Sequence, residues 1–363
     1  MKAFLILVIL GVVGWYGWQW YSDEPEELLV SEEAEVSAAP AGLGATMEAR
    51  ERRSENGRSG NGGSQAVEST SSSRSNGARV TLPPELQKLR EAADARWASL
   101  RQADRNPVTD SQAIALARDY SRVLRGLYAI AGSRGEQERL IKDRLHPLAQ
   151  AIFFSPAPYL DDETGFVVNY IVKPGDILDH IGREYGMSYQ FINILRGSNP
   201  EDGNIRPGDR LKLFNLKESG YDMHISKSDF RMDLFIGGIF ARRYDVGIGE
   251  DVTPTPAGTT HITAREKHPQ WTDPVTNRVF DYGAPGHIIG PVWLAFDPKI
   301  GRNGLGIHGY TGDGQATGSR SSNGCVRMRN EEALELYRIL VPCTTTRDGR
   351  FISRAPMRVT IID

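Results

Sequence analysis

The 363-residue chain has only two cysteines, Cys325 and Cys343. Two thiols cannot supply the set of disulfides that holds a small secreted domain together, so hydrophobic cores must stabilise the folded parts. The formal net charge is only −3, from 43 Lys and Arg against 46 Asp and Glu. No broad basic region accumulates, which argues against nucleic acid as a partner.

The chain also lacks the motifs of common metal and phosphate sites. It contains no HExxH sequence, and His261, His268 and His287 do not show metal-ligand spacing. The glycine-rich stretch 301–314 has no Lys-Ser/Thr after its glycines, as a phosphate-binding loop would have. We therefore expect no metal and no cofactor.

The strongest chemical signal is a histidine and a cysteine seventeen positions apart, His308 and Cys325. Cysteine attacks a carbonyl only as the thiolate, so it needs a base such as an imidazole to take its proton. The neighbouring Gly309 and Gly324 allow sharp turns and a close approach of backbone N–H groups to an oxyanion. Arg327 would share a face with Cys325 in an extended segment and add positive potential. The alternative is a buried structural cysteine and an unrelated histidine.

The sequence Ile307-His308-Gly309, followed after a loop by Ser322-Asn323-Gly324-Cys325-Val326-Arg327-Met328, resembles the signature of the L,D-transpeptidase catalytic domain, also called the YkuD domain. The segments 225–228, 244–249, 255–259 and 269–271 follow the order that such domains show, so the resemblance covers about residues 221 to 362. It implies that Cys325 is the nucleophile and His308 the general base and acid. The carbonyl of Gly309 would orient the imidazole, and backbone N–H groups of Gly324 and Cys325 would form the oxyanion hole.

The chain departs from this family at Asn323, where many members have histidine. An Asn side-chain amide can still donate a hydrogen bond to an oxyanion. We expect Ser322 to hold the loop without reacting, as a turn residue. Trp271 lies in a region that borders the substrate cleft in the resembling family, and packing in the core is the alternative.

The resemblance implies a peptidoglycan L,D-transpeptidase that forms 3→3 cross-links through a thioester on Cys325. Its partners would be stem peptides and glycan strands, and a carbapenem would form an adduct with the same cysteine. With water as acceptor the enzyme would be an L,D-carboxypeptidase. An NlpC-type cysteine peptidase is disfavoured because its cysteine precedes its histidine, and a non-catalytic wall-binding scaffold is the remaining alternative.

A second pattern, at residues 167–214, predicts a strand, two helices and a strand. It looks like a LysM module, which implies binding of peptidoglycan or chitin glycan in a groove between two loops. The residues expected in that groove are Gly175, Asp176, Ile177, Asn199, Pro207 and Gly208. A small packing domain without a ligand is the alternative.

Residues 3–20 contain no charged side chain, and the stretch is rich in tryptophan and tyrosine toward its end. A span of the hydrocarbon core needs about 20 apolar residues. We therefore expect residues 1–21 to be a single-pass inner-membrane anchor, with the membrane as a partner and the catalytic part in the periplasm or cell-wall space. A cleaved signal peptide is the alternative. Residues 22–82, acidic and then rich in Ser, Gly and Asn, are expected to be a disordered linker.

The chain as a whole is predicted to be an α+β multidomain protein. In a helical region at 83–156, apolar residues at steps of three and four predict three helices, the second opened by a capping box from Thr109 to Gln112 and the third kinked by Pro147. Residues 221–363 are expected to form a mostly-β sandwich of two sheets. Cys343 is either a buried thiol there or a redox partner of Cys325.

Overall fold

The computed structural model describes residues 80–156, 164–345 and 351–363. The predicted anchor and nearly all of the predicted linker lie outside these ranges. Within them, no helix is long and apolar enough to cross a membrane. The longest described helix, α2 (Pro84–Gln102), has 19 residues, but charged side chains occur along its whole length, whereas a span needs about 20 mostly apolar residues. The localisation predicted from a single-pass inner-membrane anchor is therefore corrected: no described helix supports it, and it is not carried further.

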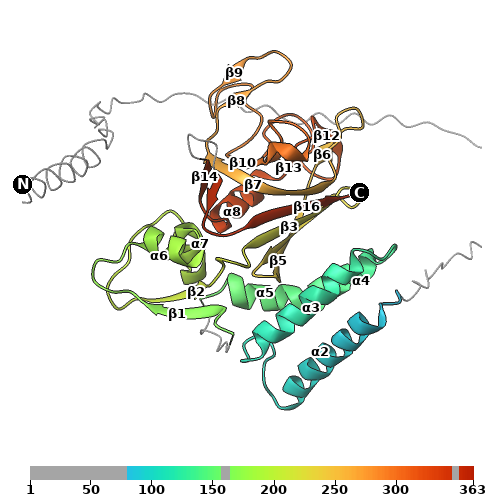
Figure 1. The fold of residues 1–363 in the computed structure, drawn as a ribbon, viewed down its shortest axis with the longest axis vertical. Helices are drawn as coiled ribbons and strands as arrows, with labels where there is room; N and C mark the ends of the chain where they lie inside the picture. The colour runs from blue at the N-terminus through green and yellow to red at the C-terminus, as the bar shows by residue number, and fades with distance from the viewer. Residues whose placement is uncertain (1–79, 157–163, 346–350) are drawn as a thin grey trace, which may run out of the picture. The chain divides into compact units, whose positions relative to one another are not determined.

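The helical region begins with α2 and α3 (Ala113–Leu127), which lie side by side (Figure 1). The apolar residues that predicted α3 are buried, among them Leu116, Tyr120 and Val123. The predicted capping box is wrong, because Gln112 is itself the N-cap of α3, not its third helical residue, and makes no side-chain cap. Asp110 takes that place, since its Oδ1 accepts a hydrogen bond of 3.0 Å from the backbone N–H of Gln112.

The third predicted helix is composite. It begins as α4 (Arg134–Leu140), widens into the π-helical turn η1 (Ile141–Leu145) and continues as α5 (His146–Phe153). Pro147 is the second residue of α5. Proline has no N–H and its ring clashes with the carbonyl four residues earlier, so a wider turn lets the chain pass it. The predicted disturbance is therefore a π turn immediately before the proline.

Residues 167–214 form β1 (Val167–Ile171), α6 (Leu178–Tyr185), α7 (Tyr189–Arg196) and β2 (Arg210–Phe214), the element order that the sequence pattern predicts. The two strands pair antiparallel. Each helix ends at a glycine in the left-handed conformation, which a glycine adopts without strain. Ser188 caps α7 by accepting a hydrogen bond of 3.0 Å from the N–H of Phe191.

The C-terminal domain is built on one eight-stranded sheet with the order β13-β11-β10-β7-β16-β3-β4-β5. Its strands are β3 (Tyr221–Ser226), β4 (Arg231–Ile236), β5 (Ile239–Asp245), β7 (Gly258–Lys267), β10 (Val292–Phe296), β11 (Gly306–His308), β13 (Val326–Arg327) and β16 (Met357–Ile362).

The mostly-β prediction is confirmed, but the two predicted sheets are joined into one by β7. Residues 258–261 of this ten-residue strand pair with β16, and residues 262–267 pair with β10. A register shift between Ala295 and Phe296 marks the change of partner. Such bulges bend a strand and increase its twist, so the sheet curls where a sandwich would have two separate sheets.

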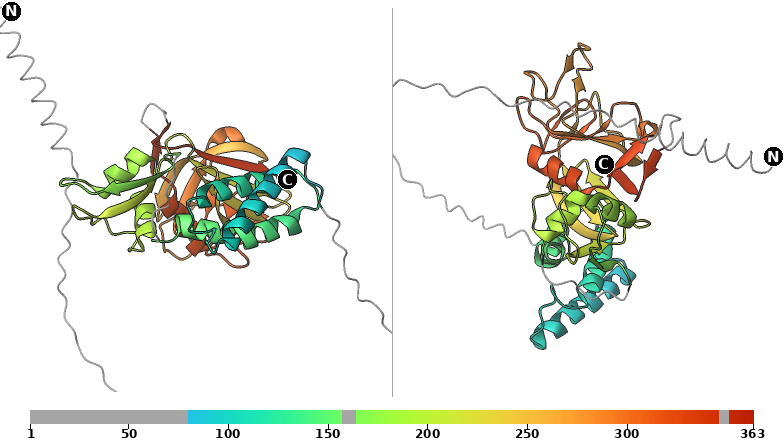
Figure 2. Two further views of the ribbon diagram at one scale, coloured as in Figure 1. Left: turned by 90° about the horizontal axis from the view of Figure 1, so that it is seen from below. Right: turned by 90° about the vertical axis from the view of Figure 1, so that its left-hand side faces the viewer.

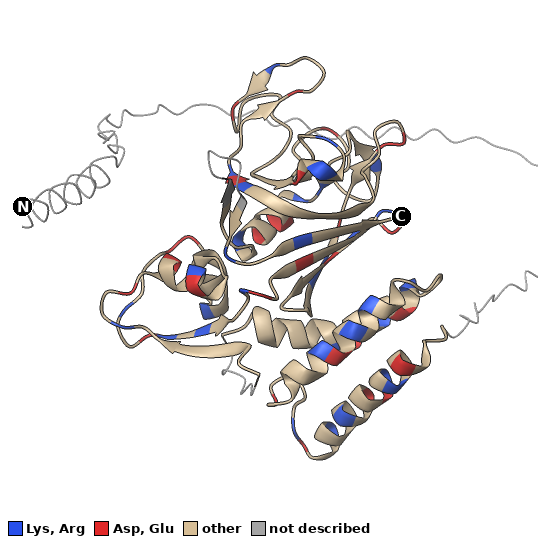
Figure 3. Cartoon of the chain, in the orientation of Figure 1, with Lys and Arg blue, Asp and Glu red and all other residues tan. Residues whose placement is uncertain are grey.

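Helices cover the sheet at two places. α8 (Asn330–Ile339) packs on β10 and β11, whereas α3 and α5 pack on β5 (Figure 1). α5 carries no Asp, Glu, Lys or Arg, while α2 and α3 carry both signs of charge (Figure 3). The helical region and the hairpin of β8 (Trp271–Thr272) and β9 (Val279–Phe280) lie at opposite ends of the described fold (Figure 2).

Small elements complete the domain. They are β6 (Ile248–Gly249), the 3-10 turn η2 (Pro298–Ile300), β12 (Arg320–Ser322), β14 (Cys343–Thr345) and β15 (Phe351–Ser353). β6 pairs with β12, directly ahead of the predicted nucleophile.

Candidate active site

Two short parallel strands bring the predicted base and nucleophile together. β11 ends at His308, and β13 begins one residue after Cys325. The strands pair with Ile307 opposite Val326 and His308 opposite Arg327. His308 and Cys325 both line one cavity of about 370 Å³. The strand pairing therefore brings two residues that are seventeen positions apart in the sequence to the same cavity.

The His308 imidazole is buried, with only 4% of the residue exposed. Its Nδ1–H donates a hydrogen bond of 2.5 Å to the carbonyl oxygen of Gly309. This bond orients the ring and leaves Nε2 as the basic nitrogen. Burial lowers the pKa of His308 to about 4, against the opposing effect of the Gly309 carbonyl. The imidazole is therefore neutral near pH 7 and able to accept a proton.

Cys325 is half-buried, and its Sγ lies 3.5 Å from the carbonyl oxygen of Gly304. Burial raises the pKa of the Cys325 thiol above its ordinary value. The backbone of Gly306 and the positive charges of Arg302 and Arg327 oppose that rise. The resting site thus holds a thiol beside an imidazole, both uncharged.

Gly309 has no room for a side chain. A Cβ there would lie 2.2 Å from Asn330 Oδ1 and 3.0 Å from Pro291 Cδ. The same Oδ1 of Asn330, the first residue of α8, accepts a hydrogen bond of 2.9 Å from the N–H of Tyr310. Asn330 therefore braces the loop that carries the acceptor of His308. Asn330 was not predicted as a site residue, because its only distinguishing feature in the sequence is its position at the start of a helix.

The loop before Cys325 depends on glycine and serine. Gly324 has φ of 92°, a conformation that L-residues with side chains rarely adopt. The Ser322 hydroxyl is buried and donates a hydrogen bond of 2.6 Å to the Cys325 carbonyl oxygen. That contact is consistent with the loop-holding role expected of Ser322. Asn323 is exposed and lines the cavity.

Arg327, expected to share a face with Cys325, and Trp271, expected at the cleft or in the core, both line the cavity. The Arg327 guanidinium stacks on the Tyr310 ring at 4.0 Å, and its Nη1 donates to Ser321 Oγ at 3.2 Å. Trp271 lies on the β8–β9 hairpin, against the ring of Phe280. Aromatic and guanidinium planes therefore form much of the wall.

Three further cavity residues were not predicted from the sequence. They are Glu266 on β7, Trp293 on β10 and Arg302 on the loop before β11. Glu266, Trp293 and His308 lie opposite one another on three neighbouring strands. Only the sheet register places them together, so no spacing in the sequence could have indicated it.

The expected glycan residues lie in two loops that touch. Gly175, Asp176 and Ile177 follow β1, whereas Asn199, Pro207 and Gly208 lie between α7 and β2. The Gly208 N–H donates a hydrogen bond of 2.8 Å to the carbonyl oxygen of Val172. Ile177 is 53% exposed and Ile171 is 57% exposed beside these loops. The unit thus presents apolar side chains to solvent near the expected groove.

Cys343 is a free thiol, as is Cys325. Burial raises the pKa of Cys343 to about 11, so its thiolate is scarce near pH 7. In the described part of the chain, no cluster of three or more His, Cys, Asp or Glu residues could hold a metal ion.

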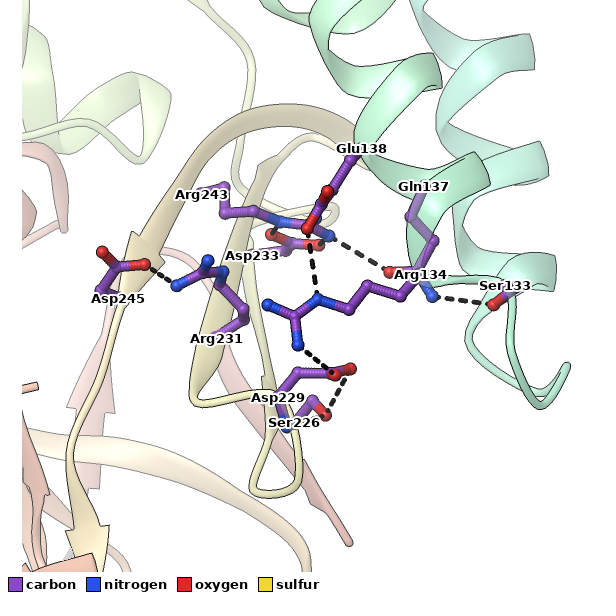
Figure 4. Close-up of polar contacts among 10 residues, drawn as sticks. All are labelled: Ser133, Arg134, Gln137, Glu138, Ser226, Asp229, Arg231, Asp233, Arg243 and Asp245. Atoms are coloured by element: carbon purple, nitrogen blue, oxygen red, sulfur yellow. Dashed lines mark hydrogen bonds and ion pairs between the residues drawn. The ribbon is translucent and has the colours of Figure 1, made fainter. Parts of the chain in front are cut away.

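A second cavity, of about 340 Å³, lies between the α3–α4 turn and the strands β3 to β5. It is lined by Arg134, Arg231 and Arg243, each of which pairs with a carboxylate (Figure 4). Arg243 holds Asp233 through two hydrogen bonds of 2.7 Å. Because carboxylates already neutralise these arginines, this cavity offers few unpaired charges to a charged ligand. The cavity with His308 and Cys325 is therefore the better candidate site.

Comparison with known proteins agrees with this geometry. Residues 220–356 match the family model of the L,D-transpeptidase catalytic domain. YkuD of Bacillus licheniformis, to which L,D-transpeptidase activity is ascribed, is 26% identical over 176 residues, which are 47% of this chain and 92% of that protein. YqjB of Bacillus subtilis, with the same ascribed activity, is 32% identical over 99 residues, 27% of this chain and 53% of that one.

Solved structures also show similarity. The catalytic domain of the Enterococcus faecium L,D-transpeptidase is 19% identical over 40% of this chain and 98% of that domain, with a TM-score of 0.29. The L,D-transpeptidase of Mycobacterium smegmatis is 13% identical over 43% of this chain and 64% of that one, also with a TM-score of 0.29. By the family match and the curated relatives, residues 220–356 of this chain are similar to the L,D-transpeptidase catalytic domain.

Proposed function

We propose that the chain is a peptidoglycan L,D-transpeptidase that forms 3→3 cross-links through a thioester on Cys325. One observation carries the proposal. His308 ends one strand and Cys325 immediately precedes the strand paired with it, and both residues line one cavity. The Gly309 carbonyl orients the His308 imidazole. The similarity of this segment to the L,D-transpeptidase catalytic domain supports the same reaction.

In the first half-reaction, Cys325 Sγ attacks the carbonyl carbon of the third residue of a tetrapeptide stem while its proton passes to Nε2 of His308. The carbonyl oxygen gains the negative charge, which the N–H groups of Gly324 and Cys325 and the Asn323 amide stabilise. The intermediate then collapses, and the bond to the leaving nitrogen breaks. His308 returns its proton to that nitrogen, so D-alanine leaves as an amine and the stem remains as a thioester.

In the second half-reaction, an amine of a neighbouring stem attacks the thioester carbonyl and gives its proton to His308. The carbon–sulfur bond breaks, the 3→3 amide is released, and the sulfur recovers the proton from His308. Water in place of the amine would release a tripeptide and make the enzyme an L,D-carboxypeptidase. A carbapenem carbonyl would acylate Cys325 by the same first step.

The unit at 167–214 is proposed to be a LysM module that holds the glycan strand. The alignment with B. licheniformis YkuD spans 176 residues, more than the 137 between 220 and 356. Because only seven residues follow Pro356, that similarity extends upstream of residue 220, toward this unit. The unit is also bound to α8, through Ser188 Oγ donating to the Arg338 carbonyl and Arg338 pairing with Glu201 at 2.9 Å. A bound glycan would therefore be held in a defined place relative to the catalytic domain.

The proposal is tested by incubating the full chain with a disaccharide-tetrapeptide and following the products by mass spectrometry, with Cys325→Ala alongside. We expect loss of D-alanine and a cross-linked dimer with the wild type, and neither product with the variant. Loss of D-alanine without a dimer would assign a carboxypeptidase. No turnover of the tetrapeptide by the folded wild type would favour a wall-binding scaffold.

Glycan binding is measured separately, by sedimentation with purified peptidoglycan. Ile177→Asp changes an exposed side chain beside the expected groove and should reduce the bound fraction without destabilising the fold. Val275→Asp, at an exposed position on the β8–β9 turn, is the matched control and should bind like the wild type. Equal binding of wild type and Ile177→Asp would remove these loops from the glycan site.

A further inference from the structure

We propose that Arg302 recognises the free C-terminal carboxylate of the donor stem and so selects which peptide Cys325 attacks. This inference rests on the proposed function and names a specificity residue for it. Arg302 lies outside the His-Gly and Ser-x-Gly-Cys motifs, on the loop between η2 and β11. Nothing in its local sequence marks it as a binding residue.

Arg302 has no carboxylate partner in the described structure. Among the described residues, neither Arg302 nor Arg327 forms an ion pair, whereas each arginine of the second cavity does. Arg327 is already held by Tyr310 and Ser321. Glu266 is the single carboxylate among the described lining residues, and it lies two strands away from His308. The described lining therefore carries two arginines against one carboxylate, an excess of positive charge that suits an anionic group.

Arg302 lies next to the loop that carries the nucleophile. Its Nη2 donates to the carbonyl oxygen of Asn323, two residues before Cys325. On the other side, Cys325 Sγ faces the carbonyl of Gly304, two residues after Arg302. One bond to Asn323 leaves other guanidinium N–H groups free, and a guanidinium edge can bind a carboxylate through two parallel hydrogen bonds.

The chemistry of the substrate places a carboxylate at this location. In the stem peptide, D-alanine is the last residue, so its carboxylate carbon is two bonds from the nitrogen that leaves. When Sγ reaches the scissile carbonyl, that carboxylate must lie within a few ångströms of the cysteine. In a longer stem the carboxylate would be about 3.8 Å farther along the chain. A fixed guanidinium next to Cys325 therefore favours cleavage of the last residue only.

Arg302 could instead act only through the protein, by holding the Asn323 loop or by lowering the pKa of Cys325. Either of these effects would change the rate with every substrate by the same factor. Recognition of a carboxylate would change it only for substrates that carry one. The two explanations are therefore separated by a substrate whose terminal carboxylate is replaced by a neutral carboxamide.

The experiment measures kcat/KM of the full chain for the disaccharide-tetrapeptide and for its C-terminal carboxamide. The variants are Arg302→Gln, Arg302→Lys and, as the matched control, Lys299→Gln, which removes one positive charge from η2 outside the cavity. We expect the wild type and Lys299→Gln to prefer the acid by about tenfold to hundredfold, the usual effect of a hydrogen bond to a charged group. Arg302→Gln should lose that preference, because its kcat/KM should fall about tenfold to hundredfold more for the acid than for the amide, and Arg302→Lys should keep part of it.

Equal losses for acid and amide in Arg302→Gln would overturn the proposal and leave Arg302 a positioning residue. So would a wild type that turns over acid and amide equally well. If the wild type turned over neither substrate, the proposed function would fail and this inference with it. Circular dichroism and thermal unfolding of each variant show whether a loss of activity comes from misfolding.

Discussion

The neutral resting state of His308 and Cys325 makes a testable prediction about thiol reactivity. Burial lowers the pKa of His308 to about 4 and raises that of the Cys325 thiol. Between these two values neither group is charged. The proton should therefore move from sulfur to Nε2 only as the substrate is attacked, in contrast to cysteine enzymes that rest as a thiolate–imidazolium pair.

The difference between the two states is large near neutral pH. A thiol whose pKa lies above the ordinary value of about 8.5 is less than about 3% thiolate at pH 7, and its alkylation rate rises about tenfold per pH unit. An ion pair with a thiolate pKa of about 4 would be fully reactive at pH 7 and would show no such rise. The thiolate fractions in the two cases thus differ by at least about thirtyfold at pH 7.

The assay is iodoacetamide labelling of the full chain from pH 5 to 10, followed by intact mass. Cys343→Ala leaves Cys325 as the only cysteine of the sequence. We expect the labelling rate to rise throughout, with no plateau below pH 9. Replacing His308 by Gln should leave the profile nearly unchanged, because a neutral imidazole contributes little charge. A plateau below pH 7 that disappears in His308→Gln would refute the neutral pair.

Three further predictions follow from the contacts around the site. Gly309→Ala would place a Cβ 2.2 Å from Asn330 Oδ1, so we expect the loop to shift and kcat/KM to fall at least about tenfold, as a misplacement near 1 Å typically causes, while circular dichroism stays native. The pKa of His308 is lower in the folded chain than in the unfolded chain, so the unfolded chain binds the proton first as pH falls. The free energy of unfolding should therefore drop between pH 6.5 and about 4, by about 3 kcal/mol at 1.36 kcal/mol per pH unit. Urea unfolding of His308→Gln should lack this pH-dependent drop. Ser121 Oγ accepts a hydrogen bond of 2.9 Å from the buried N–H of Phe240, so Ser121→Ala should cost about 1–3 kcal/mol of unfolding free energy with kcat/KM unchanged; a change in kcat/KM would contradict the structural role given to this contact.

The parts of the molecule that were predictable from the sequence are those set by local patterns. The apolar steps of α3 and α8 and the alternation in β3 and β16 each reflect one buried face, which the sequence displays directly. The capping box from Thr109 was a false signal, since Asp110 competes for the same backbone donors. Local chemistry therefore indicated the elements, but it did not decide between two polar residues one position apart.

The site was only partly predictable, for a different reason. His308 and Cys325 stand out because their motifs combine glycine with reactive side chains. Asn330 and Arg302 reach the site through tertiary contacts, across a helix start and a loop. Such contacts depend on the register of short strands, which two or three residues of sequence cannot specify.

The two halves of the curled sheet have different tasks, and β7 connects them. β7, β10 and β11 supply Glu266, Trp293 and His308 to the catalytic cavity, and the residue before β13 supplies Cys325. On the other half, β3 and β4 carry the docking contacts of the helical region, through pairs such as Arg125 with Asp222 at 2.9 Å and Tyr128 with Asp233 at 2.5 Å.

β3 also contacts the 167–214 unit, because the Tyr221 hydroxyl donates to the Gly186 carbonyl at 3.0 Å. The helical region therefore covers a part of the sheet that carries none of the proposed catalytic residues. β7 pairs with both halves, but the docking contacts and the catalytic residues lie on different strands. Substitutions on the docking half should therefore alter stability, and substitutions on the catalytic half should alter kcat/KM.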